Sequence, residues 1–219
     1  MNIAENLNLV RRQLPSGVKL VAVSKTYPAG AIQEALEAGQ TCFGESRVQE
    51  LTVKQARFPQ LEWHFIGHLQ TNKVKQIVSF VGLIHSVDSL RLLQEINAQA
   101  VKAGRVVDCL LQAYIAREES KFGLDADELH GLLARCSDGA FPGVRICGLM
   151  GMASNTPQSE VVRAEFRALR AIFDAAKKQY YADKSYFCEL SMGMSSDYSI
   201  AVEEGSTMVR IGSAIFGHR

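Results

Sequence analysis

The sequence predicts a single (β/α)8 barrel (TIM barrel), an α/β fold in which eight parallel strands alternate with helices. Short apolar runs rich in β-branched residues recur along the whole chain, and segments with helical periodicity separate them. Several runs are apolar at consecutive positions, which is typical of strands covered on both faces. Eight such units favour a closed barrel over its main competitor, an open doubly wound sheet. With 219 residues the barrel is compact, since the fold typically takes about 250.

Eight runs are predicted to be strands, because each is apolar and bounded by polar or turn-forming residues. Val21, Ala22 and Val23 in the first run, and Cys109 and Leu110 in the fifth, are apolar on both faces. The predicted strands are 19–24, 41–44, 63–67, 83–87, 106–115, 145–150, 187–191 and 208–216.

The clearest predicted helix covers 164–180, where one face is apolar and the charged side chains lie mostly elsewhere. Thr156 is predicted to cap it, with Pro157 at its first position. The apolar face comprises Val162, Phe166, Leu169, Phe173 and Ala176, and the charged set comprises Arg163, Glu165, Arg167, Arg170 and Lys177.

Capping signals place three further helices. Asp88 and Ser89 precede a helix over 90–102, and Gly104 follows its end. Gly205 ends a helix over 197–204, which is predicted to be the last one. A helix over 2–13 precedes the first strand. With no linker or low-complexity tract between these elements, the chain is expected to form one domain over residues 1–219.

Composition excludes several classes of protein. Apolar residues make up 47% of the chain and charged residues 21%, and the formal net charge is +1. A general binder of nucleic acid or of a membrane surface needs a concentrated basic face, which this balance does not supply. No run approaches the roughly 18 apolar residues of a membrane span, and no secretory signal opens the chain. The sequence therefore predicts a cytoplasmic protein.

The cysteine and histidine spacings do not indicate a metal site. The five cysteines form no CxxC pair, and reduced thiols are expected. The five histidines show no paired ligand spacing. His64 is interpreted as a core histidine, whereas His68 follows the third strand and could line the barrel mouth.

Lys25 is the most informative residue of the sequence. Active sites of barrels lie at the carboxyl ends of the strands, and Lys25 follows the first strand with the same parity as Val21 and Val23. A lysine directed into an apolar mouth would be desolvated, which favours the neutral amine and makes it a nucleophile for Schiff-base formation. The alternative is a lysine that simply reaches into water.

Glycines and serines follow the seventh strand and recur in the eighth. Ser191, Met192, Gly193 and Ser195 precede a helix predicted to start near Ser196. Glycine allows close backbone approach, serine offers a hydroxyl, and a helix start presents free amides to an anion. Gly212 and Ser213 add a second approach, and barrels often bind phosphate after strands 7 and 8. A tight turn with capping serines is the alternative.

Two further strand ends and one arginine complete the predicted site. Ser46 follows the second strand, and Met150 ends the sixth. Arg210 lies two residues before Gly212, where it could donate to the ring nitrogen of a pyridine or to a phosphate. A structural ion pair of Arg210 with Glu189 or Glu45 is equally compatible with the sequence.

Seven segments resemble the signatures of the pyridoxal 5′-phosphate (PLP) homeostasis protein family, in the right order and over nearly the whole chain. The segment from Ser191 to Asp197, continued by the run from Met208 to Gly217, is the most specific. The others are Ala22 to Pro28, Phe43 to Glu50, Trp63 to Lys73, and Glu119 to Gly123 with Gly148 to Met150.

This resemblance implies a fold-type III PLP barrel like the N-terminal domain of alanine racemase. Lys25 matches the lysine that forms the Schiff base, and Arg210 matches the arginine near the pyridine. The phosphate region is matched by Ser191, Gly193, Ser195, Gly212 and Ser213. The family implies a monomeric, cytoplasmic protein without established catalysis, implicated in PLP supply, with PLP-dependent apo-enzymes as possible partners.

Two positions depart from the family pattern. Ser46 stands where asparagine is common, which puts a side-chain contact to the ring in doubt. Tyr114 stands near the end of the fifth strand, where asparagine or histidine is expected, and could reshape the mouth.

Three functions remain open from the sequence. A PLP-binding carrier or regulator without catalytic residues fits a cofactor site with little beside it. A PLP-dependent amino-acid racemase would need a second proton-transfer group opposite Lys25, for which Tyr27 or Tyr114 would have to point inward. A Schiff-base aldolase or phosphosugar enzyme would use the same lysine and phosphate site without a cofactor.

Overall fold

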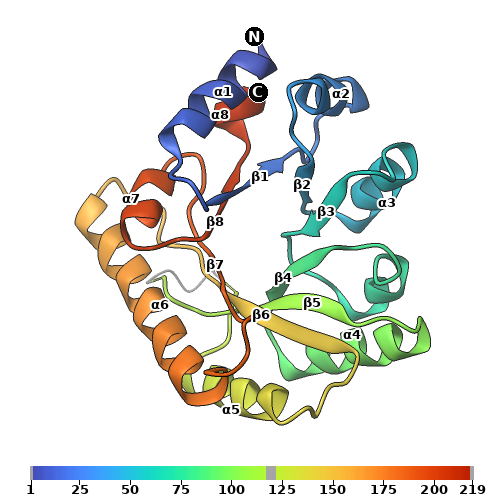
Figure 1. Cartoon of the computed structure of the whole chain (residues 1–219), viewed down its shortest axis with the longest axis vertical. Coiled ribbons are helices and arrows are strands. Elements are labelled where there is room, and N and C mark those ends of the chain that lie inside the picture. Colours follow the sequence, from blue (N-terminus) through green and yellow to red (C-terminus); the bar gives the residue numbers. More distant parts are fainter. Residues whose placement is uncertain (1, 117–121, 218–219) are drawn as a thin grey trace.

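Eight parallel strands close into a barrel in chain order (Figure 1). The computed structural model describes residues 2–116 and 122–217. Each strand pairs with its sequence neighbours, and β8 pairs with β1, with Lys19 opposite Met208 and Val21 opposite Arg210. The prediction of a closed barrel is confirmed, and the alternative prediction of an open doubly wound sheet is wrong. The strands are β1 (Lys19–Val23), β2 (Cys42–Glu45), β3 (Glu62–Phe65), β4 (Leu83–Val87), β5 (Val107–Gln112), β6 (Val144–Met150), β7 (Glu189–Ser191) and β8 (Met208–Ile211).

Helices surround the barrel and cover the outer faces of its strands (Figure 1). The segment between β3 and β4 is a 3-10 helix, whereas the other connections that contain a helix use α-helices. The helices are α1 (Ile3–Gln13), α2 (Ala29–Glu37), α3 (Val48–Arg57), η1 (Thr71–Gln76), α4 (Leu90–Lys102), α5 (Ala126–Ser137), α6 (Ser159–Tyr180), α7 (Tyr198–Glu203) and α8 (Ser213–Phe216).

The strands bury side chains on both faces, as their continuous apolar runs predict. One cluster of buried residues fills the barrel interior, and a larger cluster lies between the strands and the helices. The interior cluster is formed by Val21, Cys42, Leu83, Leu110, Cys147, Met150 and Met208. Because Val21 lies in this cluster, alternate residues of β1 point toward the barrel axis.

The two ends of the described chain lie side by side, where α1 packs on α8 (Figure 1). The Asn6 side chain donates to the Ile215 carbonyl at 2.9 Å. Tyr27, after β1, donates its hydroxyl to the Gly217 carbonyl, and its ring lies 5.0 Å from that of Phe216. These contacts join the segment after β1 to the segment after β8.

Two predicted elements differ from the structure. The run 208–216 is not one strand, because β8 ends at Ile211 and Gly212 begins the short helix α8, so that 197–204 is not the last helix. The long helix α6 begins at Ser159 with Gln158 at its N-cap, so Thr156 and Pro157 precede it. The Thr156 hydroxyl instead accepts from the Gln158 amide at 3.2 Å.

Glu165 of α6 also differs from the prediction, which places it outside the buried face of the helix. It is buried, and its two carboxylate oxygens accept from the amide of Ser154 at 2.7 Å and from the Ser154 hydroxyl at 2.8 Å. Glu165 therefore holds the loop between β6 and α6.

The predicted ends of α4 are confirmed. The Ser89 hydroxyl caps the helix by accepting from the Leu92 amide at 3.3 Å, and Gly104 follows its end with a φ of +65°. Among the described residues, no helix is both long and apolar enough to cross a lipid bilayer.

Candidate functional site at the carboxyl ends of the strands

A cavity of about 780 Å³ opens at the carboxyl ends of the strands. Its wall combines residues from the ends of β1, β2, β3, β6, β7 and β8, so segments far apart in the sequence meet there. The lining residues are Val23, Lys25, Tyr27, Ser46, Ile66, Met152, Met194, Ser195, Ser196, Arg210, Gly212, Ser213, Ala214 and Gly217. This volume lies in the range of about 300–1,000 Å³ that is typical of small-molecule sites.

Lys25 lies where the sequence places it, beyond the end of β1 and beside Val23 in the cavity wall. The desolvation expected from the sequence is wrong, because Lys25 is exposed. The residue that follows, Thr26, has a φ of +66°, a conformation that non-glycine residues rarely adopt. The backbone therefore turns sharply just after Lys25.

A buried ion pair supports the strand end that carries Lys25. The Lys54 ammonium donates to the Glu45 carboxylate at 2.7 Å and to the Ser24 carbonyl at 2.8 Å. The Ser24 hydroxyl donates to the same Glu45 oxygen at 2.6 Å. Burial raises the pKa of Glu45, and the hydrogen bonds from Lys54 and Ser24 oppose that rise.

Glu50 holds the turn that follows Lys25. Its carboxylate accepts from the Thr26 amide at 2.6 Å and from Lys54 at 3.4 Å. Burial opposes ionisation of Glu50, but the Thr26 amide and the Lys54 charge outweigh it and lower the pKa of Glu50. The sharp turn at Thr26 is therefore stabilised by a charged acceptor.

The loops after β7 and β8 are joined by one serine. The Ser195 hydroxyl accepts from the Gly212 amide at 3.2 Å and from the Ala214 amide at 3.4 Å. Ser195, Gly212 and Ser213 all line the cavity. Hydroxyl and amide groups are thus concentrated on the side of the mouth formed by β7 and β8.

Gly193 is required by the packing of its loop against α7. Its φ is +95°, and a Cβ atom there would lie 2.6 Å from the Ala201 Cβ and 2.9 Å from the Tyr198 Cα. The following helix starts at Tyr198, not near Ser196, and has six residues. The polar groups that face the cavity therefore come from the loop and not from a long helix start.

Arg210 is buried in the cavity wall, and its hydrogen bonds go to oxygens of neighbouring strands. It donates to the Ser191 carbonyl at 2.9 Å, to the Ser191 hydroxyl at 2.6 Å and to the Gly151 carbonyl at 3.3 Å. Burial lowers the pKa of Arg210 to about 10, and the charge of Asp197 opposes this change. The ion pair with Glu189 or Glu45 that the sequence allowed does not form.

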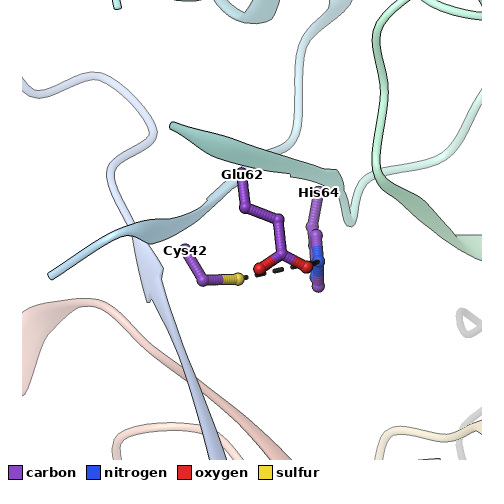
Figure 2. Close-up of side chains that lie close together, drawn as sticks. All are labelled: Cys42, Glu62 and His64. Carbon is purple, nitrogen blue, oxygen red and sulfur yellow. Dashed lines mark hydrogen bonds and ion pairs between the residues drawn. The ribbon is translucent and has the colours of Figure 1, made fainter. Parts of the chain in front are cut away.

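A chain of hydrogen bonds runs from Arg210 through the barrel interior to the opposite end. Ser191 Oγ lies 3.0 Å from His85 Nδ1, His85 Nε2 lies 3.0 Å from His64 Nδ1, and His64 Nε2 lies 2.8 Å from Glu62 Oε1. His64, Glu62 and Cys42 point toward one another at that end (Figure 2).

The groups at each position indicate which atom donates each of these hydrogen bonds. Burial and the charge of His64 hold the pKa of His85 well below its usual range, so its imidazole is neutral. The hydrogen bond from His64 lowers the pKa of Glu62 to about 2, so this carboxylate can only accept. One arrangement satisfies all of these contacts, with each group donating toward Glu62: Ser191 to His85, His85 to His64, and His64 to the carboxylate.

Four of the predicted site residues lie outside the cavity wall. Ser191 is buried beneath the wall in contact with Arg210, Met192 is fully buried, and Met150 belongs to the interior cluster. Gly193 is also outside the wall, in the position described above. The other predicted residues, Lys25, Ser46, Ser195, Arg210, Gly212 and Ser213, line the cavity together.

Two residues considered for the mouth, Tyr114 and His68, lie outside the cavity wall. Tyr114 is partly exposed and is not part of the wall. His68 stacks on Phe122 at 4.6 Å and contacts Asp88 at 2.9 Å, so it does not line the cavity. The part of the resemblance carried by residues 119–121 lies outside the described residues.

Sequence reasoning missed His85 and the pair of Glu45 with Lys54. The signal for His85 was available, because Leu83 and His85 share the parity of one strand and Leu83 faces the interior. No comparable signal joins Glu45 to Lys54, since their contact depends on how α3 packs on the barrel.

Comparisons with known proteins agree over the full length of the chain. Residues 1–219 match the family described as "Alanine racemase, N-terminal domain". The chain is 38% identical over 231 residues to a "Pyridoxal phosphate homeostasis protein" of Aquifex aeolicus, covering 100% of this chain and 99% of that protein. It is 40% identical over 235 residues to the protein of the same name from Escherichia coli K12, with coverages of 100% and 97%.

Solved structures show the same fold. PipY of Synechococcus elongatus PCC7942 without PLP has a TM-score of 0.92 at 41% identity, covering 98% of this chain and 100% of PipY. PipY with PLP bound has a TM-score of 0.90 at 40% identity, with the same coverages. The alanine racemase of Streptomyces coelicolor A3(2), at 19% identity and a TM-score of 0.75, covers 100% of this chain and 58% of that chain and shares the fold.

Proposed function

The chain belongs to the alanine racemase N-terminal domain family, with full-length relatives named pyridoxal phosphate homeostasis proteins, and on this premise we propose that it binds PLP at the carboxyl-end cavity and serves in PLP homeostasis. Lys25 is the residue of covalent attachment in this proposal. The protein holds and supplies the cofactor and does not turn over a substrate.

One observation carries the proposal: Lys25 lines the same cavity as Ser195, Gly212 and Ser213. PLP is a phosphorylated aldehyde, and when bound it supplies a carbonyl for a lysine amine and a phosphate for hydrogen-bond donors. The chain provides the amine on β1 and hydroxyl and amide groups after β7 and β8. The residues present therefore fit the cofactor.

The roles of the other predicted site residues follow from their positions. Ser195, Gly212 and Ser213 would hold the phosphate, and Ser46 lines the same cavity. Ser191, Met192, Gly193 and Met150 act from outside the wall by holding the loop and the interior in place. Arg210, kept in the wall by Ser191 and Gly151, would hold the pyridine ring of the cofactor.

The composition of the wall favours a carrier over a racemase. If Arg210 donates to the ring nitrogen of bound PLP, that nitrogen would stay unprotonated, which would weaken the ring as an electron sink. Racemisation also needs a second proton-transfer group opposite the lysine. Tyr27 lines the cavity, but its hydroxyl donates to the Gly217 carbonyl, and Tyr114 is outside the wall.

The rest of the proposal concerns where the protein acts. We place it in the cytoplasm as a monomer, with PLP-dependent apo-enzymes as recipients of the cofactor. Neither nucleic acid nor a membrane is a partner, because the net charge of +1 provides no general attraction to either.

An absorbance spectrum from about 300 to 500 nm tests the binding, where PLP bound to a lysine amine absorbs. The wild-type protein is expected to show a visible band that Lys25→Ala lacks. Borohydride reduction followed by peptide mass spectrometry is expected to fix PLP on the peptide that contains Lys25. Absence of the band after PLP is added would contradict the proposal, and phosphorylated sugars would then be tested as ligands.

A separate experiment tests the absence of turnover. The PLP-loaded protein is incubated with single L-amino acids, and the enantiomers are resolved by chiral chromatography. No racemisation is expected. Turnover at ordinary enzyme rates, about 1–1,000 s⁻¹, would support the racemase instead.

A further inference from the structure

The amino ends of the strands carry a second group of chemically active side chains, on the opposite side of the barrel from the PLP cavity. Cys42 begins β2, and Glu62 begins β3 with His64 two residues later. A cavity of about 410 Å³ opens there and is lined by Cys42 and Glu62. Solvent can therefore reach the cluster without passing through the PLP site.

The three side chains point one ligand atom each toward a common position (Figure 2). Their ligand atoms all lie within 4.8 Å of one another. Cys42 Sγ and His64 Nε2 are 3.6 Å apart, and His64 Nε2 and Glu62 Oε1 are 2.8 Å apart. In a tetrahedral zinc site, a sulfur at about 2.3 Å and a nitrogen at about 2.0 Å are separated by about 3.5 Å. The distance from Cys42 Sγ to His64 Nε2 already fits. Glu62 is partly exposed, so it can move to lengthen the distance from its Oε1 to His64 Nε2.

The arrangement differs from that of a catalytic thiol. A nucleophilic cysteine needs a histidine with one nitrogen toward the sulfur and the other toward the group that orients the ring. Here the same nitrogen, His64 Nε2, faces both the Cys42 sulfur and the Glu62 carboxylate. Convergence of three donors on one point is the geometry of metal binding.

His85 supplies the contact that orients a metal-binding histidine. Its Nε2 lies 3.0 Å from His64 Nδ1, the nitrogen that remains when Nε2 binds a metal. Metal-ligating histidines almost always donate their second N–H to a fixed acceptor, which sets the ring orientation and the tautomer. His85 is buried and held in turn by Ser191, so this acceptor is fixed.

We propose that Cys42, Glu62 and His64 are the ligands of a site for a divalent transition metal, and that the bound ion is Zn²⁺. Thiolate and imidazole select zinc over the hard cations, and the carboxylate completes a three-residue set. The fourth position faces the cavity at the amino ends and takes a water molecule. This proposal differs from the prediction made from the sequence, which expects no metal site.

Binding changes the protons of the cluster in a defined way. The Cys42 thiol loses its proton to solvent and binds as thiolate, and Glu62 binds as carboxylate. His64 moves its proton from Nε2 to Nδ1 and donates to His85, which becomes the Nδ1–H tautomer and donates to Ser191.

Lys19 competes with the metal. Its ammonium donates to Glu62 Oε1 at 2.9 Å, and both side chains are partly exposed. Zinc must displace this hydrogen bond and share the carboxylate with a neighbouring positive charge. Removal of the ammonium is therefore expected to raise the affinity for zinc.

Isothermal titration of the full-length, PLP-loaded protein with ZnCl₂ tests the site, and elemental analysis after desalting gives the stoichiometry. Wild type is expected to bind one zinc. Cys42→Ser and Glu62→Gln are expected to weaken binding at least about 100-fold, because loss of a group that only orients a ligand already costs about 10- to 100-fold. Lys19→Met is expected to bind more tightly than wild type.

Matched controls separate ligation from other effects. Cys188→Ser removes the exposed thiol, and Glu189→Gln removes a carboxylate near Lys19 without removing a proposed ligand. Both are expected to retain wild-type zinc affinity, and circular dichroism verifies that each variant is folded. No binding by wild type, equal binding by Cys42→Ser and wild type, or weaker binding by Lys19→Met overturns the proposal. Because the PLP band is read separately, failure here leaves the proposed function untouched.

Discussion

Lys54 places an ammonium in the protein interior, directly behind the strand end that carries Lys25. Its hydrogen bonds go to Ser24, Glu45 and Glu50. The second oxygen of Glu45, Oε2, is buried and has no hydrogen-bond partner within the described residues. The Glu45 carboxylate thus depends on Lys54 and Ser24 for its stabilisation.

Lys54→Met is expected to lower the free energy of unfolding by about 3–5 kcal/mol, because it leaves the Glu45 charge buried and unpaired. Denaturant unfolding at pH 7 measures the change. Lys75→Met, at an exposed position on η1, is the matched control and is expected to stay within about 0.5 kcal/mol of wild type. A loss below about 1 kcal/mol in Lys54→Met would show that Glu45 is satisfied without the ammonium.

Glu50, which holds the turn at Thr26, makes the stability of the protein depend on pH. Its folded pKa is lowered from 4.5, so the unfolded chain takes up its proton at a higher pH than the folded protein does. The stabilisation by ionised Glu50 is complete above about pH 4.5 and is lost as the pH falls through the lower folded value.

Glu50→Gln is therefore expected to be less stable than wild type at pH 7, by about 1 kcal/mol, because a neutral amide oxygen accepts a weaker hydrogen bond than a carboxylate does. The difference is expected to shrink toward pH 3. Unfolding curves at several pH values check this. A difference that grows on acidification would reverse the assigned direction of the shift.

At the residue scale, the sequence could locate Lys25 because parity along one strand is a local property. Its exposure could not be predicted, since it depends on the shape of a mouth built from several strands. Arg210 shows the same limit. The sequence offered Glu189 and Glu45 as partners, but the sheet places Ser191 and Gly151 beside it.

Among the elements, the loop after β7 is the part of the site that depends most on a neighbouring helix. A side chain at position 193 would meet α7 at Ala201 and Tyr198. Any shift of α7 that relieves this contact also moves Ser195 and Ser196, which line the cavity.

Gly193→Ala is expected to destabilise the protein by at least about 1 kcal/mol more than Gly17→Ala, because overpacking adds to the strain of a positive φ. Gly17 is a close control, since its φ of +98° is similar to the +95° of Gly193 and a Cβ there would meet nothing within 4 Å. Thermal unfolding and PLP titration provide the measurements. PLP affinity is expected to fall in Gly193→Ala and not in Gly17→Ala, and equal affinities would separate the loop from PLP binding.

Local signals predicted the elements well where a capping side chain does what its type favours, as Ser89 does. They were wrong at Thr156, where α6 begins three residues later, and at Gly212, where an apolar run changes from strand to helix. The burial of Glu165 could not be predicted, because its partner Ser154 lies in a preceding loop.

For the whole molecule, closure of β8 on β1 is what brings Lys25 to the serines of the last two strands. In the proposed site, PLP would contact segments from both ends of the chain, so it would stabilise the folded state only when the barrel is closed. The count of strand and helix segments predicted this closure, whereas the register that aligns Val21 with Arg210 is a property of the assembled sheet.

Addition of PLP at about 100 times its dissociation constant is expected to raise the free energy of unfolding by about 2.7 kcal/mol. Lys25→Ala at the same PLP concentration is expected to gain less, because it lacks covalent attachment. Chemical denaturation with and without PLP measures both. The same gain in both proteins would mean that PLP stabilises the fold without Lys25.

The joining of β1 to β8 also has a consequence for biosynthesis. Lys25 emerges early from the ribosome, but Ser195, Gly212 and Ser213 are among the last residues of this sequence to be made. A nascent chain that has completed six strands carries the Lys25 amine but lacks the residues that are proposed to bind the phosphate. In the proposed site, PLP could therefore be captured only after the last strand of the barrel has been made, and a retained cofactor would report that synthesis of the barrel has been completed.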